Sequence, residues 1–154
     1  MTLVQKWAWV FAGFFLFVYV ITNIPAFNDA QGYNFGLFKI DPIDNVVHLI
    51  TAILGAVAAW HSAHWSRRFL WIFGILYALD AATGMVSQLG LLDLSLIHNT
   101  LLGETVVNPD FGIKNWLINA PHIAIAAVMI SLGTWLYPAL ARGRTFLDTL
   151  AFMS

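Results

Sequence analysis

The sequence contains no cysteine among its 154 residues, and only 10% of them are charged. The absence of cysteine excludes disulfide bonds, thiolate metal sites and cysteine nucleophiles. Because 7 lysines and arginines stand against 8 aspartates and glutamates, the formal net charge is −1, and no basic field exists to bind nucleic acid. Apolar residues make up 60% of the chain, with a mean hydropathy of +0.76. Soluble domains are less apolar and more highly charged, so the composition indicates an integral membrane protein.

Four long stretches with few charges are candidates for membrane crossing. About 20 apolar residues are needed to cross the hydrocarbon core of a bilayer as a helix. The predicted spans cover residues 7–24, 45–65, 69–92 and 115–141. Only helices satisfy every backbone group within one segment in lipid, so the predicted fold class is all-α. We expect an integral membrane four-helix bundle that forms a single transmembrane domain over residues 1–154.

The positions of lysine and arginine predict the orientation, because cytoplasmic loops carry an excess of both. One side of the predicted bundle collects Lys6, Arg67, Arg68, Arg142 and Arg144. The opposite side has only Lys39 and Lys114, and it is rich in carboxylates: Asp29, Asp41, Asp44, Asp93, Glu104 and Asp110. Both termini are therefore predicted to be cytoplasmic, in a multi-pass protein of the bacterial inner membrane. The apolar second outer loop, around residues 91–102, is expected to form an interfacial helix or to rest on the bundle.

An internal repeat relates the second and fourth predicted spans. Aligning the chain with itself places Asp41, Asn45 and His48 over Asn115, Asn119 and His122. Positions i, i+4 and i+7 fall within about 60° of arc on a helix, so each span would carry one polar stripe that ends in histidine. A weaker correspondence pairs Gly13 with Gly74 and Thr22 with Thr83 in the other two spans. The bundle is thus expected to consist of two repeated helical hairpins of the same orientation.

Small residues continue the same stripes below the histidines. They are Ala52, Gly55 and Ala59 in the second span, and Ala126 and Gly133 in the fourth. Small side chains let helix backbones approach closely in lipid, where packing replaces the hydrophobic force. The second and fourth spans are therefore predicted to form the inner pair of the bundle. Asp41 is the predicted N-cap of the second span, followed by Pro42 at its first helical position.

The residues also resemble a known family. The segments that carry the resemblance are GLFKIDPIDNVVHLITAILG, RRFLWIFGILYALDAATG and NWLINAPHIAIAA. They are similar to the bacterial four-helix membrane family catalogued as domain of unknown function 4383. The most specific part is a doubled N-x-x-H motif, formed by Asn45 and His48 and by Asn119 and His122, although the second copy contains Pro121. The resemblance implies the fold and no activity.

Three residues within the predicted spans are candidates for function, because ionisable groups at membrane depth are costly. His48 and His122 are the axial ligands that a haem or another pigment would use, since bundle cores hold cofactors between facing helices. The alternatives are another metal, or hydrogen bonds from each histidine to a carbonyl or an asparagine, and the small residues below favour these bonds over haem. Asp80 is the one carboxylate inside a span, and it is expected to pair with Asn, Thr or His, or to begin a proton or ion path.

No motif for enzymatic chemistry is present. The sequence contains no G-x-S-x-G, H-E-x-x-H or phosphate-binding glycine loop, so we do not expect an enzyme. His61 and His64 lie at i and i+3 without a third ligand nearby in sequence, so no metal site is predicted there. The aromatic first span and the apolar outer loop favour an accessory or scaffold subunit of a larger membrane assembly, with other subunits or further copies of the chain as partners. The alternatives are a haem- or pigment-binding electron-transfer module that uses His48 and His122, and a small proton or ion transporter around Asp80.

Overall fold

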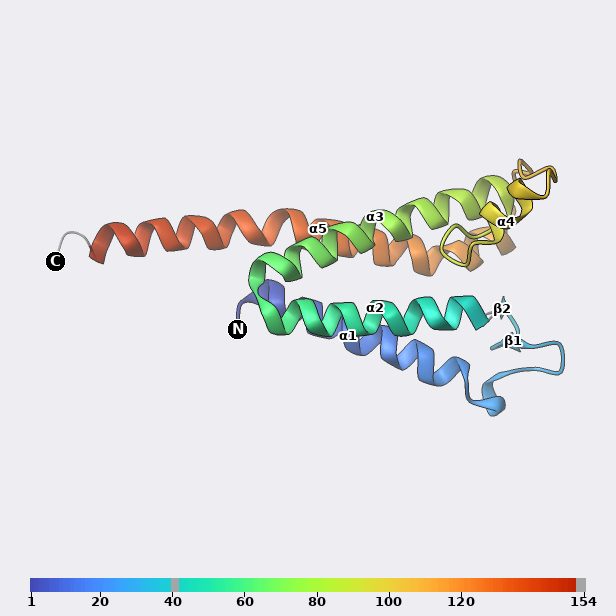
Figure 1. Ribbon diagram of the computed structural model, residues 1–154, viewed down its shortest axis with the longest axis horizontal. Helices are drawn as coiled ribbons and strands as arrows, with labels where there is room; N and C mark the ends of the chain where they lie inside the picture. Colours follow the sequence, from blue (N-terminus) through green and yellow to red (C-terminus); the bar gives the residue numbers. More distant parts are fainter. Residues whose placement is uncertain (40–41, 152–154) are drawn as a thin grey trace.

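The computed structural model describes residues 1–39 and 42–151, with side chains for 1–38 and 42–135. Four long helices dominate it (Figure 1): α1 (Leu3–Thr22), α2 (Pro42–His61), α3 (Ala63–Ser87) and α5 (Ile113–Ala151). The shorter elements are η1 (Pro25–Phe27), β1 (Tyr33–Asn34), β2 (Phe38–Lys39) and α4 (Ser95–Leu101). All four long helices are apolar and long enough to cross a membrane. The predicted all-α membrane bundle is confirmed.

The long helices pack as two hairpins. The most extensive contacts join α1 to α2 and α3 to α5, while α2 and α3 make fewer. The start of α1 and the end of α5 lie at the same end of the bundle, and the loops that contain β1, β2 and α4 lie at the other (Figure 1). We call this second end the loop end. The arrangement agrees with two helical hairpins that run in the same direction.

The expectation that the second and fourth spans form the inner pair is wrong. α2 and α5 make at most marginal contact. Their small residues pack against α3 instead. A Cβ atom placed on Gly55 of α2 would lie 2.8 Å from the ring of Phe69 on α3. One placed on Gly133 of α5 would lie 3.1 Å from Trp71, also on α3. The small residues therefore allow α3 to pack closely against both α2 and α5.

Some helices end at other residues than the predicted spans, because the apolar sequence continues past the point where the helix stops. α2 ends at His61, and Ser62 starts α3 by accepting a hydrogen bond from the Trp65 N–H. α3 ends at Ser87 instead of residue 92, because Gln88 adopts a left-handed conformation with φ 59°. The leucines that follow are apolar but form a loop. α5, in contrast, extends beyond residue 141 to Ala151.

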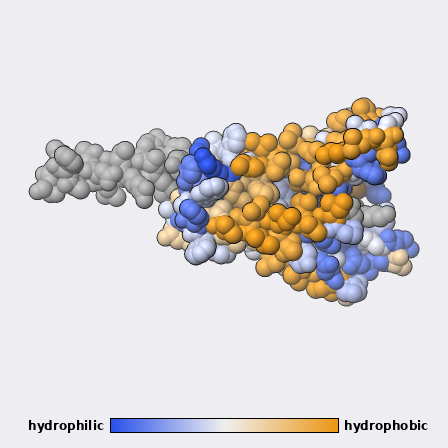
Figure 2. Space-filling view, viewed as in Figure 1, coloured by the Kyte–Doolittle hydropathy of each residue, from blue (hydrophilic) through white to orange (hydrophobic). Residues whose placement is uncertain are grey.

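Large apolar side chains cover the outside of the described helices. Val10 and Phe17 on α1, Val57 on α2, Ile72 on α3 and Val128 on α5 are all exposed. Figure 2 shows hydrophobic residues as a band across the helices, with hydrophilic residues gathered at both ends of it. A surface of this kind is stable only in lipid. The chain is therefore a multi-pass membrane protein that contacts the lipid bilayer.

The loop end contains the predicted helix of the second outer loop, which is α4. Leu101 and Leu102 at its end are exposed. In the first outer loop, β1 and β2 form a short antiparallel hairpin in which Asn34 is buried. Pro42 begins α2 and Asp44 lies in its first turn, as predicted. The predicted N-cap residue, Asp41, lies outside the described residues.

Candidate functional site

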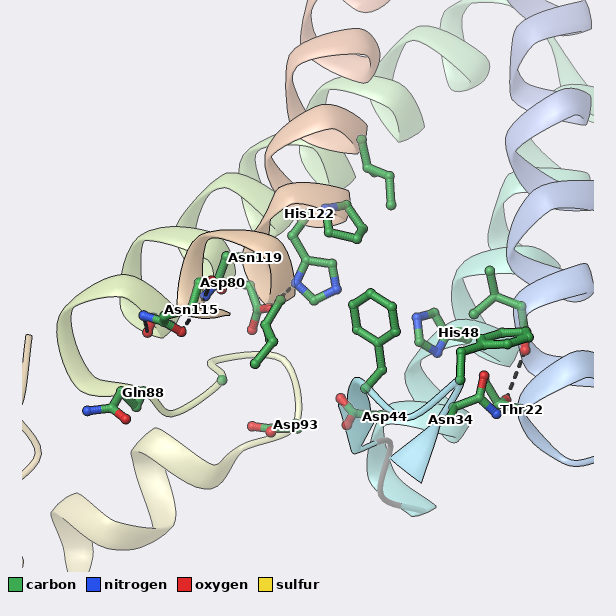
Figure 3. Close-up of a pocket in the computed structure, with 18 of the residues that line it drawn as sticks. Thr22, Asn34, Asp44, His48, Asp80, Gln88, Asp93, Asn115, Asn119 and His122 are labelled. Carbon is green, nitrogen blue, oxygen red and sulfur yellow. Dashed lines mark hydrogen bonds and ion pairs between the residues drawn. The ribbon is translucent and has the colours of Figure 1, made fainter. Parts of the chain in front are cut away.

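A cavity of about 810 Å³ lies between the two hairpins at the loop end. All four long helices and both outer loops contribute to its wall. We call it the outer cavity and define it by Asn34, Asp44, His48, Asp80, Asn119 and His122, which are labelled in Figure 3. Both candidate histidines and the candidate carboxylate of the sequence analysis therefore meet at one site.

Asp80 and His122 form a pair across the second hairpin. Nδ1 of His122 lies 2.7 Å from Oδ2 of Asp80, and the Asp80 side chain is 7% exposed whereas that of His122 is 30% exposed. The other oxygen, Oδ1, accepts hydrogen bonds from the backbone N–H groups of Leu91 at 2.7 Å and Leu92 at 2.8 Å. Of the three partner types expected for Asp80, the structure shows histidine. Both carboxyl oxygens are thus occupied.

The pairing orients the imidazole of His122. When Nδ1 donates to a carboxylate, the ring is fixed in one orientation, and Nε2 is the atom left for another partner. The ring extends from α5 into the outer cavity (Figure 3). His122 therefore presents a preset hydrogen-bonding or ligating atom to whatever occupies this space.

His48 lies on the opposite wall of the same cavity (Figure 3). Its Nδ1 atom is buried and makes no hydrogen bond of good geometry, although the Asp44 backbone is near. Its ring stacks on Phe15 with a centroid separation of 6.2 Å, and Phe15 stacks on Tyr77 at 5.2 Å. The ring of Tyr77 in turn meets His122 edge-on at 5.3 Å. Two aromatic rings therefore link the two histidines, and we call these four residues the aromatic chain.

Two asparagines of the polar stripes, Asn45 and Asn115, bond to a neighbouring helix. Oδ1 of Asn45 lies 2.6 Å from the hydroxyl of Thr22 and so links α2 to α1. Asn115 donates to the Gly84 carbonyl of α3 at 3.2 Å and to the Asp110 carbonyl at 2.7 Å. Asn119 donates to Asn115, to its carbonyl at 2.9 Å and to Oδ1 at 3.0 Å. Asn115 and Asn119 also line the outer cavity.

Sequence reasoning missed several parts of the site. The N–H groups of Leu91 and Leu92 leave no trace in residue type, because any residue except proline supplies them. Phe15 and Tyr77 look like ordinary apolar positions of their helices. Thr22 did carry a signal, since the repeat singles it out together with Thr83.

The remaining histidines stand apart from the outer cavity. His61 and His64 lie at the opposite end of the bundle and are exposed, and His61 contacts the ring of Trp65 at 5.8 Å. His98 is exposed on α4. Over the described part of the chain, no group of three or more His, Cys, Asp or Glu residues is placed to hold a metal ion.

The family comparison covers most of the first three long helices. Residues 5–107 match the family described as "Domain of unknown function (DUF4383)". The chain belongs to this family. The part that matches DUF4383 contains His48 and Asp80, whereas Asn119 and His122 lie beyond it on α5. Searches of curated proteins and of solved structures find no significant match.

Proposed function

We propose that this DUF4383 protein binds a small ligand in the outer cavity, and that it does so without catalysing a reaction. The observation that carries the proposal is the imidazole of His122, held at Nδ1 by Asp80 and extended into the cavity. Binding sites in membrane proteins are typically concave and mostly apolar, with a few well-placed polar groups. His122 and His48 are polar groups of this kind, on opposite walls of one space.

The accessory or scaffold role expected from the sequence stays a prediction. Such a role would use the exterior of the bundle to contact other subunits or further copies of the chain. Exposed apolar residues such as Phe17 and Val128 are accounted for by lipid alone. A scaffold also has no need of an internal cavity with an oriented imidazole. Ligand binding therefore explains a feature that a scaffold role leaves unexplained.

A haem or another pigment is the second candidate, as the ligand of an electron-transfer module. Two histidines that line one cavity from opposite walls favour it, because a metal-ligating histidine usually has its second nitrogen bonded to a carboxylate or a carbonyl. His122 has such a bond to Asp80. Nε2 of His122 and the imidazole of His48 would hold such a group, which would supply the capacity to accept and pass on an electron.

Transport around Asp80 has less support. Below the aromatic chain the core is apolar, with Leu70, Ala126 and Met129 all buried. Both oxygens of Asp80 are already engaged by His122 and by the second outer loop. A proton or ion path would need further polar groups towards the other end of the bundle. The buried polar side chains there, Thr51 and Ser66, donate to the backbone carbonyls of Val47 and Ala58, so the transport role stays a prediction.

We also propose that the protein lies in the bacterial inner membrane with both termini in the cytoplasm. Arg67 and Arg68 near the turn between α2 and α3 support this orientation. The outer cavity then lies on the side away from the cytoplasm, where the outer loops carry the acidic residues.

The test combines native mass spectrometry with absorption spectroscopy on protein purified in lipid nanodiscs. We expect a bound small molecule in the wild type that is lost in His122→Ala and retained in the matched variant His98→Ala. A reducible Soret band that disappears in His48→Ala would identify the ligand as haem. If the wild type carries no bound molecule, and no compound of a fragment library changes its thermal stability in a His122-dependent way, ligand binding is wrong.

A further inference from the structure

We propose that the ligand of the outer cavity is a neutral amphiphile dissolved in the membrane, with an oxygen-bearing head group such as a quinone or quinol. We propose further that it enters sideways between α1 and α5. This inference rests on the proposed binding function and names the ligand class and its route. Three observations carry it: the few contacts between these helices beside exposed lining residues of α1, the loops that form the wall at the loop end, and the charges of the wall.

The seam between α1 and α5 is a side of the bundle where two long helices make few contacts with each other. Both helices contribute apolar side chains to the cavity wall, Phe14 and Phe17 from α1 and Ile118 and Ile125 from α5. Phe14 is 41% exposed and Phe17 is 59% exposed. The same side chains therefore line the cavity and lie on the exposed side of α1. An apolar chain can occupy this seam and remain in contact with lipid.

Both outer loops contribute to the cavity wall at the loop end. The second outer loop is fastened to the end of α3 by backbone bonds from Asn108 N–H to the Val86 carbonyl at 3.0 Å and from Asp110 N–H to the Met85 carbonyl at 3.3 Å. On the other side, the buried Asn34 of β1 forms part of the cavity wall. The second outer loop and Asn34 therefore form part of the cavity wall at the loop end, whereas Phe14 and Phe17 line the cavity on the exposed side of α1.

The charges of the wall select the head group. Apart from Asp80 and Asp44, two carboxylates line the cavity, on Asp93 and Asp110, whereas Lys114 is the one lysine or arginine among its described lining residues. This excess of negative charge disfavours a phosphate or carboxylate head group. The imidazoles of His48 and His122 remain to bond oxygen atoms from opposite sides. A ring with oxygen atoms on opposite edges fits this arrangement.

The test uses the protein in phosphatidylcholine nanodiscs, with 15N-labelled histidine side chains observed by NMR. The probes are a 1,4-benzoquinone with a decyl chain, the same quinone without the chain, and dodecyl phosphate. We expect the decyl quinone to shift the signals of His48 and His122, with an apparent affinity at least tenfold higher than that of the chainless quinone. Dodecyl phosphate is expected to leave both signals unchanged.

The seam is tested by chemical blocking after folding, which is possible because the chain has no cysteine. Phe17→Cys is folded into nanodiscs and then modified with a bulky maleimide. Leu16→Cys, an exposed neighbour outside the cavity wall, is the matched control. We expect the modification to weaken decyl quinone binding at least tenfold at Phe17→Cys and not at Leu16→Cys.

The outcomes separate the inference from the function on which it rests. Equal affinity for the quinones with and without the chain, binding of dodecyl phosphate, or an unaffected modified Phe17→Cys protein would each overturn the proposed ligand class or route while ligand binding stands. If no probe shifts either histidine signal and the isolated protein carries no other small molecule, the proposed function fails together with the inference.

Discussion

Asp80 on α3 and His122 on α5 meet with 2.7 Å between Oδ2 and Nδ1, while the second oxygen of Asp80 accepts the N–H groups of Leu91 and Leu92. One buried carboxyl group thus joins two helices and the second outer loop. In lipid, an unsatisfied backbone N–H is costly, so this group stabilises the loop end of the bundle as well as orienting the imidazole. The site and the fold share a residue, and variants of Asp80 report on both.

The variant Asp80→Asn is expected to destabilise the protein by about 1–3 kcal/mol, because charge-assisted hydrogen bonds to His122 and the loop become neutral ones. Hydrogen exchange at the amides of Leu91 and Leu92 should become faster, and the free energy of unfolding should fall in detergent titrations. Glu104→Gln makes the same change of charge at an exposed position of the same loop and is the matched control. Equal exchange rates in Asp80→Asn and wild type would contradict the role of the carboxyl group.

Tyr77 presents the opposite case, because its buried hydroxyl makes no hydrogen bond of good geometry, although the Thr51 side chain is near. Removing a poorly satisfied buried polar group costs little or is favourable. We expect Tyr77→Phe to leave the free energy of unfolding unchanged or to raise it by up to about 1 kcal/mol.

The ring of Tyr77 matters more than its hydroxyl, because it lies between Phe15 and His122 in the aromatic chain. Tyr77→Leu should therefore lower the free energy of unfolding by more than about 1 kcal/mol through the lost ring contacts. A clear loss of stability in Tyr77→Phe, comparable with that in Tyr77→Leu, would show that the hydroxyl bonds to Thr51 or to another group.

The number of helices and the pairing into hairpins could be predicted from the sequence, because hydropathy and the internal repeat act over whole segments. The end of α3 could not, since Leu91 and Leu92 are as apolar as the helix before them. What ends the helix is the left-handed backbone of Gln88 and the hydrogen bonds of the two leucines to Asp80. These are backbone effects, and a hydropathy average does not register them.

The candidate site was predicted in part. Asp80, His48 and His122 stood out because polar side chains are rare within apolar spans, and they meet in the outer cavity. That Asp80 pairs with His122 and not with His48 could not be predicted, because it depends on which helix faces pack against one another. The small residues are an example. The stripes that contain Gly55 and Gly133 were expected to face each other, but both glycines pack against α3.

Gly74 and Gly13 are paired by the internal repeat but differ in their surroundings. A Cβ atom at Gly74 would lie 2.8 Å from the Ile130 side chain and 3.0 Å from the Ile130 backbone nitrogen, whereas one at Gly13 meets nothing within 4 Å. Gly74→Ala is therefore expected to force α3 and α5 apart and to cost about 1–3 kcal/mol. Gly13→Ala should raise the stability by about 0.5–1 kcal/mol, as for an unhindered glycine in a helix.

Both glycine variants are measured as the free energy of unfolding in mixed micelles. Equal effects of the two substitutions would mean that the second hairpin has room to adjust and that its close helix contact is not specific. A loss of stability in Gly74→Ala together with a gain in Gly13→Ala would show that only the second hairpin depends on a close helix contact at this position of the repeat.

The hydroxyl of Thr22 and Oδ1 of Asn45 lie 2.6 Å apart and provide a polar link between α1 and α2 at the loop end. A double-mutant cycle with Thr22→Val and Asn45→Ala measures this link by itself. The hydroxyl also lies 2.9 Å from the Val18 carbonyl of its own helix, but Thr22→Val removes that contact whether residue 45 is Asn or Ala, so it cancels in the cycle. Interhelical hydrogen bonds in membranes contribute about 0.6 kcal/mol on average and at most about 1.7 kcal/mol, so we expect a coupling energy in this range.

Asn23 provides the matched control for this cycle, because it follows Thr22, is exposed, and donates to the Tyr19 carbonyl of its own helix. Coupling between Asn23→Ala and Asn45→Ala is expected to be near zero. If the Thr22–Asn45 coupling is equally small, the asparagine does not stabilise the hairpin through this bond. The interhelical bonding of the polar stripes would then be confined to the second hairpin, where Asn115 donates to the Gly84 carbonyl of α3. The first hairpin would keep the bond from Gln5 to the Ala59 carbonyl as its polar link.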